Sequence, residues 1–187
     1  MDGRRIAELA AAVRGGRRAD RRLVTVDGFS GAGKTELATH LGVALDAPVL
    51  TLEELYPGWD GLADAVPLAV EWIAEPLAAG RPARWRVWDW ERGVRGAWHE
   101  LAAVPLVVLE GCGAGARALR PFTRVAIWVD APPEQRERRL RARADWPGYA
   151  PFRTRWAAQE EAFHARERTR ERADVIVDNS EIVNNSD

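Results

Sequence analysis

Several features that classify proteins are scarce or missing in this chain of 187 residues. It has one cysteine, Cys112, which excludes an internal disulfide and a metal site built from several cysteines. No apolar run reaches the roughly 18 residues that a membrane span needs, and the arginine-rich N-terminus lacks the apolar stretch of a secretory signal. We therefore predict a cytoplasmic protein with no membrane partner.

An excess of charge of one sign is also missing, because 27 basic side chains face 28 acidic ones. No overall field draws the protein toward nucleic acid or anionic lipid, so we predict no nucleic-acid partner and expect any anion-binding site to be local. The length fits a single domain over residues 1–187. Homo-oligomerisation is left open by the sequence.

Lysine is almost absent, since Lys34 is the sole lysine among the 27 basic residues. An ammonium group is a compact point charge, whereas a guanidinium is a wide planar fork. Since the chain uses arginine at every other basic position, we infer that the space around Lys34 admits an ammonium but not a guanidinium.

Short runs rich in Val, Ile and Leu predict five buried strands, and longer segments with helical spacing lie between them. Strands that alternate with helices predict an α/β fold in which helices cover both faces of a parallel sheet. An N-terminal helical segment within 1–20, centred on 6–13, precedes the first strand, and we expect the polar end, 180–187, to be frayed. The predicted strands are 23–26, 49–52, 106–109, 125–129 and 175–177, and the predicted helices are 36–45, 62–79, 132–144 and 152–172.

The segment 28–35 matches the pattern G-x-x-x-x-G-K-[ST] and stands between a predicted strand and a predicted helix. Glycines let such a loop fold back so that its backbone N–H groups point at a phosphate, next to the positive end of the helix. Lys34 is then expected to reach the β- and γ-phosphates, and the Thr35 hydroxyl to ligate Mg²⁺. We predict ATP and Mg²⁺ as cofactors, with the nucleotide bound by Gly28, Ser30, Gly31, Ala32, Gly33, Lys34 and Thr35.

Two other interpretations of this loop are weaker. A glycine-rich turn with a surface lysine does not explain the flanking strand and helix or the uniqueness of Lys34. A GTPase switch needs a second lysine in its N-K-x-D signature, and the chain has none.

Acidic residues follow the second and third predicted strands, at the edge where a wound parallel sheet collects its ligands. Transfer to a hydroxyl needs a carboxylate that accepts the proton and an acidic group that orients Mg²⁺, usually through water. Glu53 suits the first role and Glu110 the second. Favourable charge at a helix N-terminus is the alternative explanation for Glu53.

The segment 134–145 places five arginines on a predicted helix that leads into a predicted mobile loop, 146–149. Arginines that close over a nucleotide neutralise the charge of the transferred group. Arg139 and Arg143 share a helix face at the i, i+4 spacing, and we predict that they act on the phosphates. The alternative is a solvated face held by ion pairs.

Nine tryptophans stand in the chain, and Trp88 and Trp90 flank Asp89. Aromatic planes beside a carboxylate can hold a base and a sugar, so we predict that these three residues bind the substrate, with core packing as the alternative for the tryptophans. We assign no chemistry to Cys112 or to the histidines, because they lack metal-ligand spacing.

From residue 24 to about 179 the chain resembles the uridine kinase-like branch of P-loop kinases. Asp27 and the loop 28–35 match the family pattern, residues 53–56 stand at its D-x-x-Y, 88–90 at its Y-D-F, 110–111 at its E-G and 173–177 at its final A-D-V-I-I strand. The resemblance implies a three-layer α/β/α fold with a five-stranded parallel sheet in the order 2-3-1-4-5. It also implies ATP-dependent phosphorylation of a small hydroxyl-bearing substrate such as a nucleoside, with Asp60 holding a sugar hydroxyl.

The chain departs from the family at four points, one of which is that Trp88 and Trp90 replace the tyrosine and phenylalanine of its Y-D-F. Glu53 replaces the family's aspartate, Gly93 stands where the family has a histidine that contacts the pyrimidine, and we expect the β-hairpin insertion of many uridine kinases to be missing. Two alternatives follow: a nucleoside monophosphate kinase, or a regulatory protein that binds ATP without efficient turnover.

Overall fold

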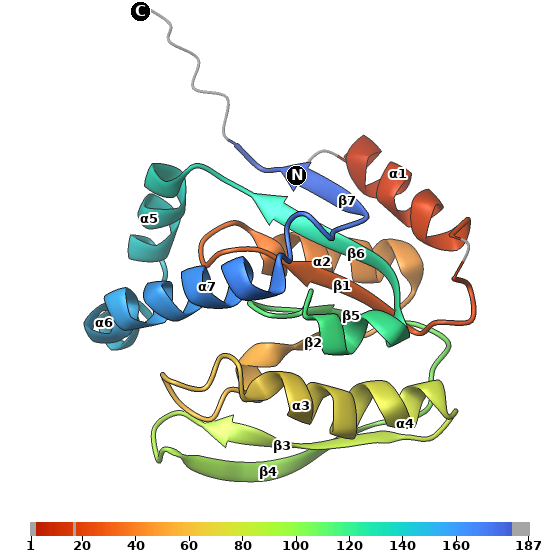
Figure 1. The fold of residues 1–187 in the computed structure, drawn as a ribbon, viewed down its shortest axis with the longest axis horizontal. Helices are drawn as coiled ribbons and strands as arrows, with labels where there is room; N and C mark the ends of the chain where they lie inside the picture. Colours follow the sequence, from red (N-terminus) through yellow and green to blue (C-terminus); the bar gives the residue numbers. More distant parts are fainter. Residues whose placement is uncertain (1–2, 17, 181–187) are drawn as a thin grey trace, which may run out of the picture.

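A five-stranded parallel sheet forms the centre of the molecule (Figure 1). The computed structural model describes residues 3–16 and 18–180. The sheet contains β1 (Leu23–Asp27), β2 (Val49–Thr51), β5 (Val107–Glu110), β6 (Thr123–Asp130) and β7 (Val175–Asp178) in the order β2-β5-β1-β6-β7, with every neighbouring pair parallel. Counted within this sheet the order is 2-3-1-4-5, which confirms the predicted topology.

Helices cover both faces of the sheet, as predicted. On one face α1 (Gly3–Arg14) and α2 (Lys34–Leu45) pack over Val24 and Val26 of β1. On the other face α3 (Ala65–Ala69), α4 (Glu75–Ala78) and α7 (Arg153–Glu167) pack over Leu23. Every residue of β1 is buried, as expected of a central strand in a sheet covered on both faces. The phosphate loop therefore starts from the most enclosed strand.

The predicted helix 62–79 forms as three consecutive helical segments, α3, a π-helical turn (Val70–Ala74) and α4. Pro76 lies inside this run. Proline has no backbone N–H and clashes with the carbonyl four residues earlier, and a wider helical turn just before it relieves that clash.

The expectation that the chain has no β-hairpin is wrong. β3 (Ala83–Asp89) and β4 (Val94–Leu101) form an antiparallel pair, which lies beyond α3 and α4 at the bottom of Figure 1. Burial alternates over the first residues of β3, since Ala83 and Trp85 are buried whereas Arg84 is exposed. That alternation is the signal of a strand with one covered face. β4 is mostly exposed, so its sequence shows no alternation of apolar and polar residues from which a strand could be predicted.

The region after β6 differs in detail from the prediction. α5 (Pro133–Arg141) ends three residues earlier than expected, and the predicted loop 146–149 is a helical turn, α6 (Trp146–Tyr149). α7 stops at Arg168, whose φ of 53° is left-handed and whose N–H caps His164 O. Within the described part of the chain, three 3₁₀ turns stand at Leu52–Glu54, Arg117–Phe122 and Ala150–Phe152.

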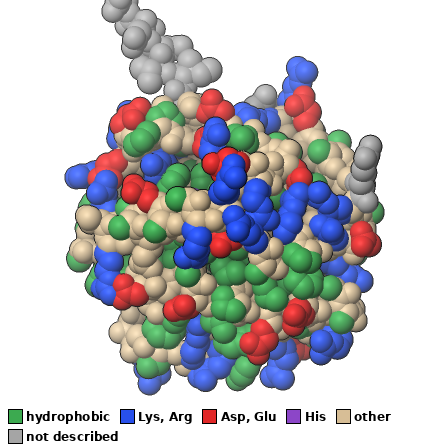
Figure 2. Space-filling view, in the orientation of Figure 1, with side chains coloured by type: hydrophobic (Ala, Val, Ile, Leu, Met, Phe, Trp, Pro, Cys, Tyr) green, Lys and Arg blue, Asp and Glu red, His purple; other side chains and the backbone are tan. Residues whose placement is uncertain are grey.

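The N-terminal helical segment predicted within 1–20 is α1, and the expected frayed tail lies outside the described residues from 181 onward. Within residues 3–16 and 18–180, no helix has both the length and the apolar character that crossing a bilayer requires. Figure 2 shows basic and acidic side chains interspersed over the face it presents, in keeping with the balanced charge of the sequence.

Candidate active site

The loop between β1 and α2 folds back on itself at three glycines. Gly28, Gly31 and Gly33 have φ values of 148°, 78° and 98°, in the region that favours glycine. A Cβ atom on Gly28 would stand 2.5 Å from the carbonyl oxygen of Val129, and one on Gly31 would stand 2.5 Å from that of Arg136. Both positions therefore need glycine for space as well as for conformation.

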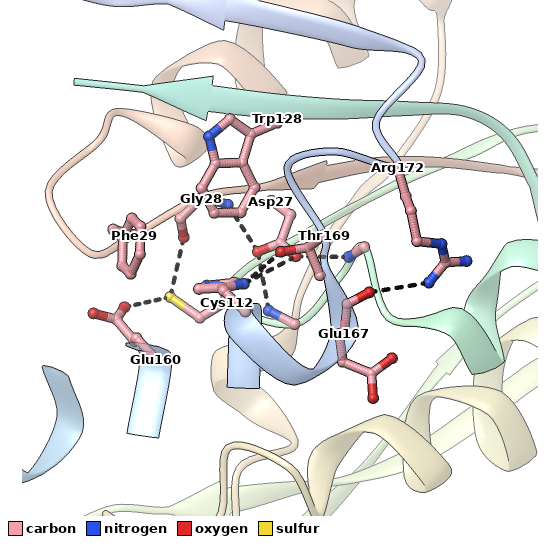
Figure 3. Close-up of polar contacts among 12 residues, drawn as sticks. Asp27, Gly28, Phe29, Cys112, Trp128, Glu160, Glu167, Thr169 and Arg172 are labelled. Atoms are coloured by element: carbon pink, nitrogen blue, oxygen red, sulfur yellow. Dashed lines mark hydrogen bonds and ion pairs between the residues drawn. The ribbon is translucent and has the colours of Figure 1, made fainter. Parts of the chain in front are cut away.

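The Asp27 carboxylate ties the base of this loop to the segment after β5. It is 2% exposed and accepts hydrogen bonds from the N–H groups of Gly28 at 2.7 Å, Gly113 at 3.0 Å and Gly115 at 2.9 Å. Figure 3 shows it surrounded by these contacts at the centre of the view. Three donors to one buried carboxylate fix the two loops relative to each other.

Lys34 is held inside the loop at the start of α2. Its Nζ donates to the carbonyl of Phe29 at 3.0 Å and to Cys112 Sγ at 3.3 Å. Burial alone would lower the pKa of Lys34, but the acidic groups around it, Cys112 first and then Glu160, raise it to about 12. The side chain is therefore a cation at neutral pH.

Cys112 and Glu160 form a buried contact beneath the loop. The Cys112 thiol donates to Glu160 Oε1 at 2.8 Å and lies 3.4 Å from the carbonyl oxygen of Gly28 (Figure 3). Ser30 donates to the same Glu160 oxygen through its backbone N–H at 2.8 Å and through its hydroxyl at 2.7 Å. Burial, reinforced by Glu160, raises the pKa of Cys112 well above its ordinary value, so the thiol stays protonated.

Sequence reasoning missed both residues of this contact. Cys112 had no metal-ligand spacing, and Glu160 lies 130 positions from Ser30. A signal for Glu160 did exist. It shares the buried side of α7 with Trp156, Phe163 and His164, at the i, i+4 and i+3 spacings of one helix face.

Thr35 and Glu110 lie next to each other at the ends of the loop and β5. The Thr35 hydroxyl donates to Glu110 Oε1 at 3.3 Å, and Glu110 is 5% exposed. Among the described residues no group of three or more His, Cys, Asp or Glu side chains can hold a metal ion by itself. One hydroxyl and one carboxylate are hard oxygen ligands, which fits Mg²⁺ bound mainly through substrate phosphates and water.

A cavity of about 1090 Å³ opens beside the phosphate loop. It brings loop residues together with the two predicted acidic residues and the two predicted arginines, although these come from four different parts of the chain. Among the predicted residues its lining includes Ser30, Gly31, Gly33, Lys34, Thr35, Glu53, Trp90, Glu110, Arg139 and Arg143. Gly28 and Ala32 belong to the loop but not to this lining.

Glu53 and Arg143 both line the cavity, and the positive charge of Arg143 acts on the Glu53 carboxyl. The Glu53 side chain is exposed to the cavity, yet the enclosing walls desolvate it and raise its pKa, with Arg143 opposing the shift and Glu110 adding to it. Arg143 donates from Nε to Asp145 Oδ1 at 2.8 Å. A carboxyl with a raised pKa accepts a proton more readily than an ordinary glutamate.

Arg139 lies against the phosphate loop. One of its terminal nitrogens donates to the carbonyl of Asn179 at 2.9 Å, and the other lies 3.4 Å from the carbonyl oxygens of Gly31 and Ala32. Because α5 ends at Arg141, Arg143 lies beyond the helix, and the predicted shared helix face does not form. Both arginines still line the cavity, Arg139 at the loop and Arg143 paired with Asp145.

Aromatic rings form the far wall of the cavity. Trp59 stacks on Phe152 with ring centres 4.6 Å apart and planes within 7°, and it contacts Trp90 at 4.8 Å. Tyr56 and Trp156 meet edge to face at 4.8 Å. The backbone of this wall is held from α7, where Gln159 Nε2 donates to the carbonyl of Trp59 at 2.6 Å.

Three predicted substrate residues lie outside this lining. Asp60 forms an ion pair with Arg155 of α7. The Asp89 carboxylate accepts the N–H groups of Glu91 at 3.1 Å and Arg92 at 2.9 Å, which shapes the hairpin turn. Trp88 carries the guanidinium of Arg95 over its ring at 5.3 Å.

Known structures share this fold over nearly the whole chain. A possible uridine kinase from Bacillus stearothermophilus superposes with a TM-score of 0.70 at 19% sequence identity, over 94% of this chain and 98% of the other. The chain has the P-loop kinase fold. A "putative fructose transport system kinase" from Silicibacter sp. gives a TM-score of 0.55 at 20% identity, over 91% of this chain and 98% of that one.

Shikimate kinase from Bacteroides thetaiotaomicron gives a TM-score of 0.50 at 18% identity, over 83% of this chain and 85% of its own. No protein-family model and no curated protein matches the sequence. The likeness to P-loop kinases is thus one of fold, and the residues of the cavity carry the argument about chemistry.

Proposed function

We propose that this protein is an ATP-dependent phosphotransferase that uses Mg²⁺ and phosphorylates a hydroxyl group of a small molecule, such as a nucleoside or a related compound. The observation that carries the proposal is the shared cavity. A phosphate loop, a carboxyl with a raised pKa and two arginines line the same space. A phosphoryl transfer site needs these groups within reach of one another.

The donor half of the site is the phosphate loop. Its backbone N–H groups and Lys34 would hold the β- and γ-phosphates, and Arg139 lies at the loop to neutralise charge. Mg²⁺ bound near Thr35 and Glu110 would supply charge neutralisation and orientation of the phosphates. The enclosed position of Lys34 keeps the ammonium where a wider guanidinium would not fit.

The acceptor half lies between Glu53 and the aromatic wall. Glu53 would take the proton from the acceptor hydroxyl as that oxygen attacks the γ-phosphorus, and Arg143 would stabilise the charge on the transferred group. Trp59, Trp90 and Phe152 offer apolar surface against which a planar or ring-shaped acceptor can pack. Asp60, Trp88 and Asp89 lie outside the lining, so the proposal gives them no direct contact with the acceptor.

The experiment that tests the proposal measures ADP formation by the purified protein with MgATP and a panel of nucleosides, sugars and other small alcohols. We expect turnover with at least one neutral acceptor, and loss of that turnover in a Glu53→Gln variant. ATP bound without turnover on any member of the panel would favour the regulatory interpretation. Absence of MgATP binding would overturn the proposal itself.

One observation favours a second candidate, a nucleoside monophosphate kinase. Arg92 is exposed and lines the acceptor end of the cavity, where a guanidinium suits a phosphate. Against this, Glu53, Glu91 and Asp145 line the same region. Including nucleoside monophosphates in the panel decides between the two candidates, because the second requires them to be better acceptors than nucleosides.

A further inference from the structure

A buried carboxylate beneath a phosphate site needs an explanation. Glu160 is 2% exposed and lies under the loop that is proposed to hold the polyphosphate. Its negative charge repels an anion bound nearby, and burial of a charge costs free energy unless hydrogen bonds offset the cost. The group must therefore do something that outweighs both effects.

The hydrogen bonds of Glu160 indicate what it does. A single oxygen, Oε1, accepts the backbone N–H and the hydroxyl of Ser30 together with the thiol of Cys112. Ser30 lies between Gly28 and Gly31, two glycines with positive φ, in a loop whose backbone has more conformational freedom than an ordinary segment. The two bonds to Ser30 thus restrain a loop that its own glycines leave flexible.

The same carboxylate also acts on Lys34 through Cys112. The thiol donates to Glu160, and its sulfur accepts from Lys34 Nζ at 3.3 Å. The chain of contacts Glu160, Cys112, Lys34 leads from α7 to the ammonium group. Without the Glu160 carboxylate, the loop loses its bonds at Ser30, and Cys112 loses the contact that holds it against Lys34.

We propose that Glu160 is a positioning residue that holds the phosphate loop and Lys34 in the nucleotide-binding arrangement before the nucleotide arrives. Its effect comes from the reach of its oxygen and not from its charge. A preorganised loop loses less conformational freedom when it binds phosphate, so the affinity for MgATP rises. This inference rests on the proposed function, because it takes MgATP to be the ligand of the loop.

Two conservative substitutions separate reach from charge. Glu160→Asp keeps the charge but withdraws the carboxylate by about 1.5 Å, one carbon–carbon bond length. Glu160→Gln keeps an acceptor oxygen at the same reach and removes the charge. Glu161→Asp is the matched control, because Glu161 is the next residue of α7 and is exposed.

The dissociation constant for MgATP is measured by titration calorimetry on the full chain. We expect Glu160→Asp to raise it roughly 10- to 100-fold, since the shorter side chain no longer reaches the N–H and the hydroxyl of Ser30. Glu160→Gln and Glu161→Asp should stay within about threefold of the wild type. Wild-type affinity in Glu160→Asp, or an equal loss in Glu160→Asp and Glu160→Gln, would overturn the inference.

Hydrogen exchange of the Ser30 amide without nucleotide gives a readout that does not depend on ATP. We expect faster exchange in Glu160→Asp than in the wild type and in Glu161→Asp, and equal exchange in all three would contradict the inference. If Glu160→Asp does not fold, Ser30→Ala replaces it. That variant removes one bond from the loop side, and unchanged MgATP affinity in it overturns the inference.

The two proposals fail in different ways. If the wild type gives no heat with MgATP, the proposed function is wrong, and the exchange measurement still decides whether Glu160 orders the loop. If the wild type binds MgATP and the Glu160 variants bind it equally well, the proposed function stands and the inference is wrong.

Discussion

Replacement of Asp27 by alanine should be among the most destabilising single substitutions in this protein. The carboxylate accepts three backbone N–H groups, from Gly28, Gly113 and Gly115, and it is 2% exposed. In Asp27→Ala, the Gly115 N–H is partly exposed and can bond water, whereas the other two donors stay buried without a partner. At roughly 2 kcal/mol for each buried donor, the expected loss is about 4 kcal/mol.

Such a loss is a large part of the roughly 5–15 kcal/mol by which a domain is stable. In Asp27→Asn the carbonyl oxygen still accepts from Gly28 and Gly113, and only the bond to Gly115 is lost, so we expect a loss of about 1–2 kcal/mol. Urea unfolding followed by circular dichroism measures both values. Asp64→Asn is the control, since Asp64 is exposed at the start of α3 and should change stability by less than about 0.5 kcal/mol.

The ordering of these variants is the decisive result. A free energy of unfolding for Asp27→Ala within about 1 kcal/mol of the wild type would refute the reasoning. It would mean that water reaches the buried donors or that the two loops separate without cost. Equal decreases in the free energy of unfolding for Asp27→Ala and Asp27→Asn would refute the assignment of two retained hydrogen bonds to the asparagine, but would still show that Asp27 stabilises the fold.

Three further predictions concern the proposed chemistry and the response to pH. Lys34→Ala should lower turnover by roughly 100- to 1000-fold while the protein still folds, and Lys34→Arg should not restore the turnover. Full ADP formation by Lys34→Arg would contradict the proposal that only an ammonium fits at this position. Glu53→Gln should lower kcat by roughly 100- to 10,000-fold. Desolvation raises the pKa of Glu53 despite the opposing charge of Arg143, so the wild-type kcat should decrease as the pH is lowered, starting above the ordinary pKa of glutamate. A kcat that decreases only below that ordinary pKa would argue against Glu53 as the base. Burial lowers the pKa of His164, against the effect of Asp27, so below about pH 6.5 the unfolded chain binds more protons than the folded one and stability falls. In His164→Gln that loss on acidification should be smaller, as denaturant titrations across pH 5–7.5 would reveal; an unchanged loss rules out His164 as its source.

The parts of the fold that depend on neighbouring residues could be predicted from the sequence. The strand, loop and helix around Lys34 are specified by residues 23–45 alone, and β1, the loop and α2 form there. The strand order came from the resemblance to known kinases, since the apolar runs give the strands but not their neighbours. The hairpin was missed because β4 is exposed along most of its length and shows no period of apolar residues.

In the site, residues marked by their place in a strand or helix could be predicted, whereas pairings between distant parts of the chain could not. Glu53, Glu110 and Arg143 were chosen by their place after strands or on a helix face, and they do line one cavity. Asp60 came from the resemblance to the kinase family, and its carboxylate pairs with Arg155, 95 positions later in the chain. No local pattern reports such a partner. The acidic residue on the buried side of α7 was a visible anomaly, but its partner in the loop was not visible.

Gln159 and Glu160 stand side by side in the chain, one bound to the carbonyl of Trp59 and the other to Ser30. A single turn of helix therefore braces both halves of the cavity, and a shift of that turn along its axis displaces the two together. Attempts to broaden the range of acceptors by altering the packing around Trp59 will consequently disturb the affinity for the donor as well. Redesign of the aromatic wall has to leave the register of this helix untouched.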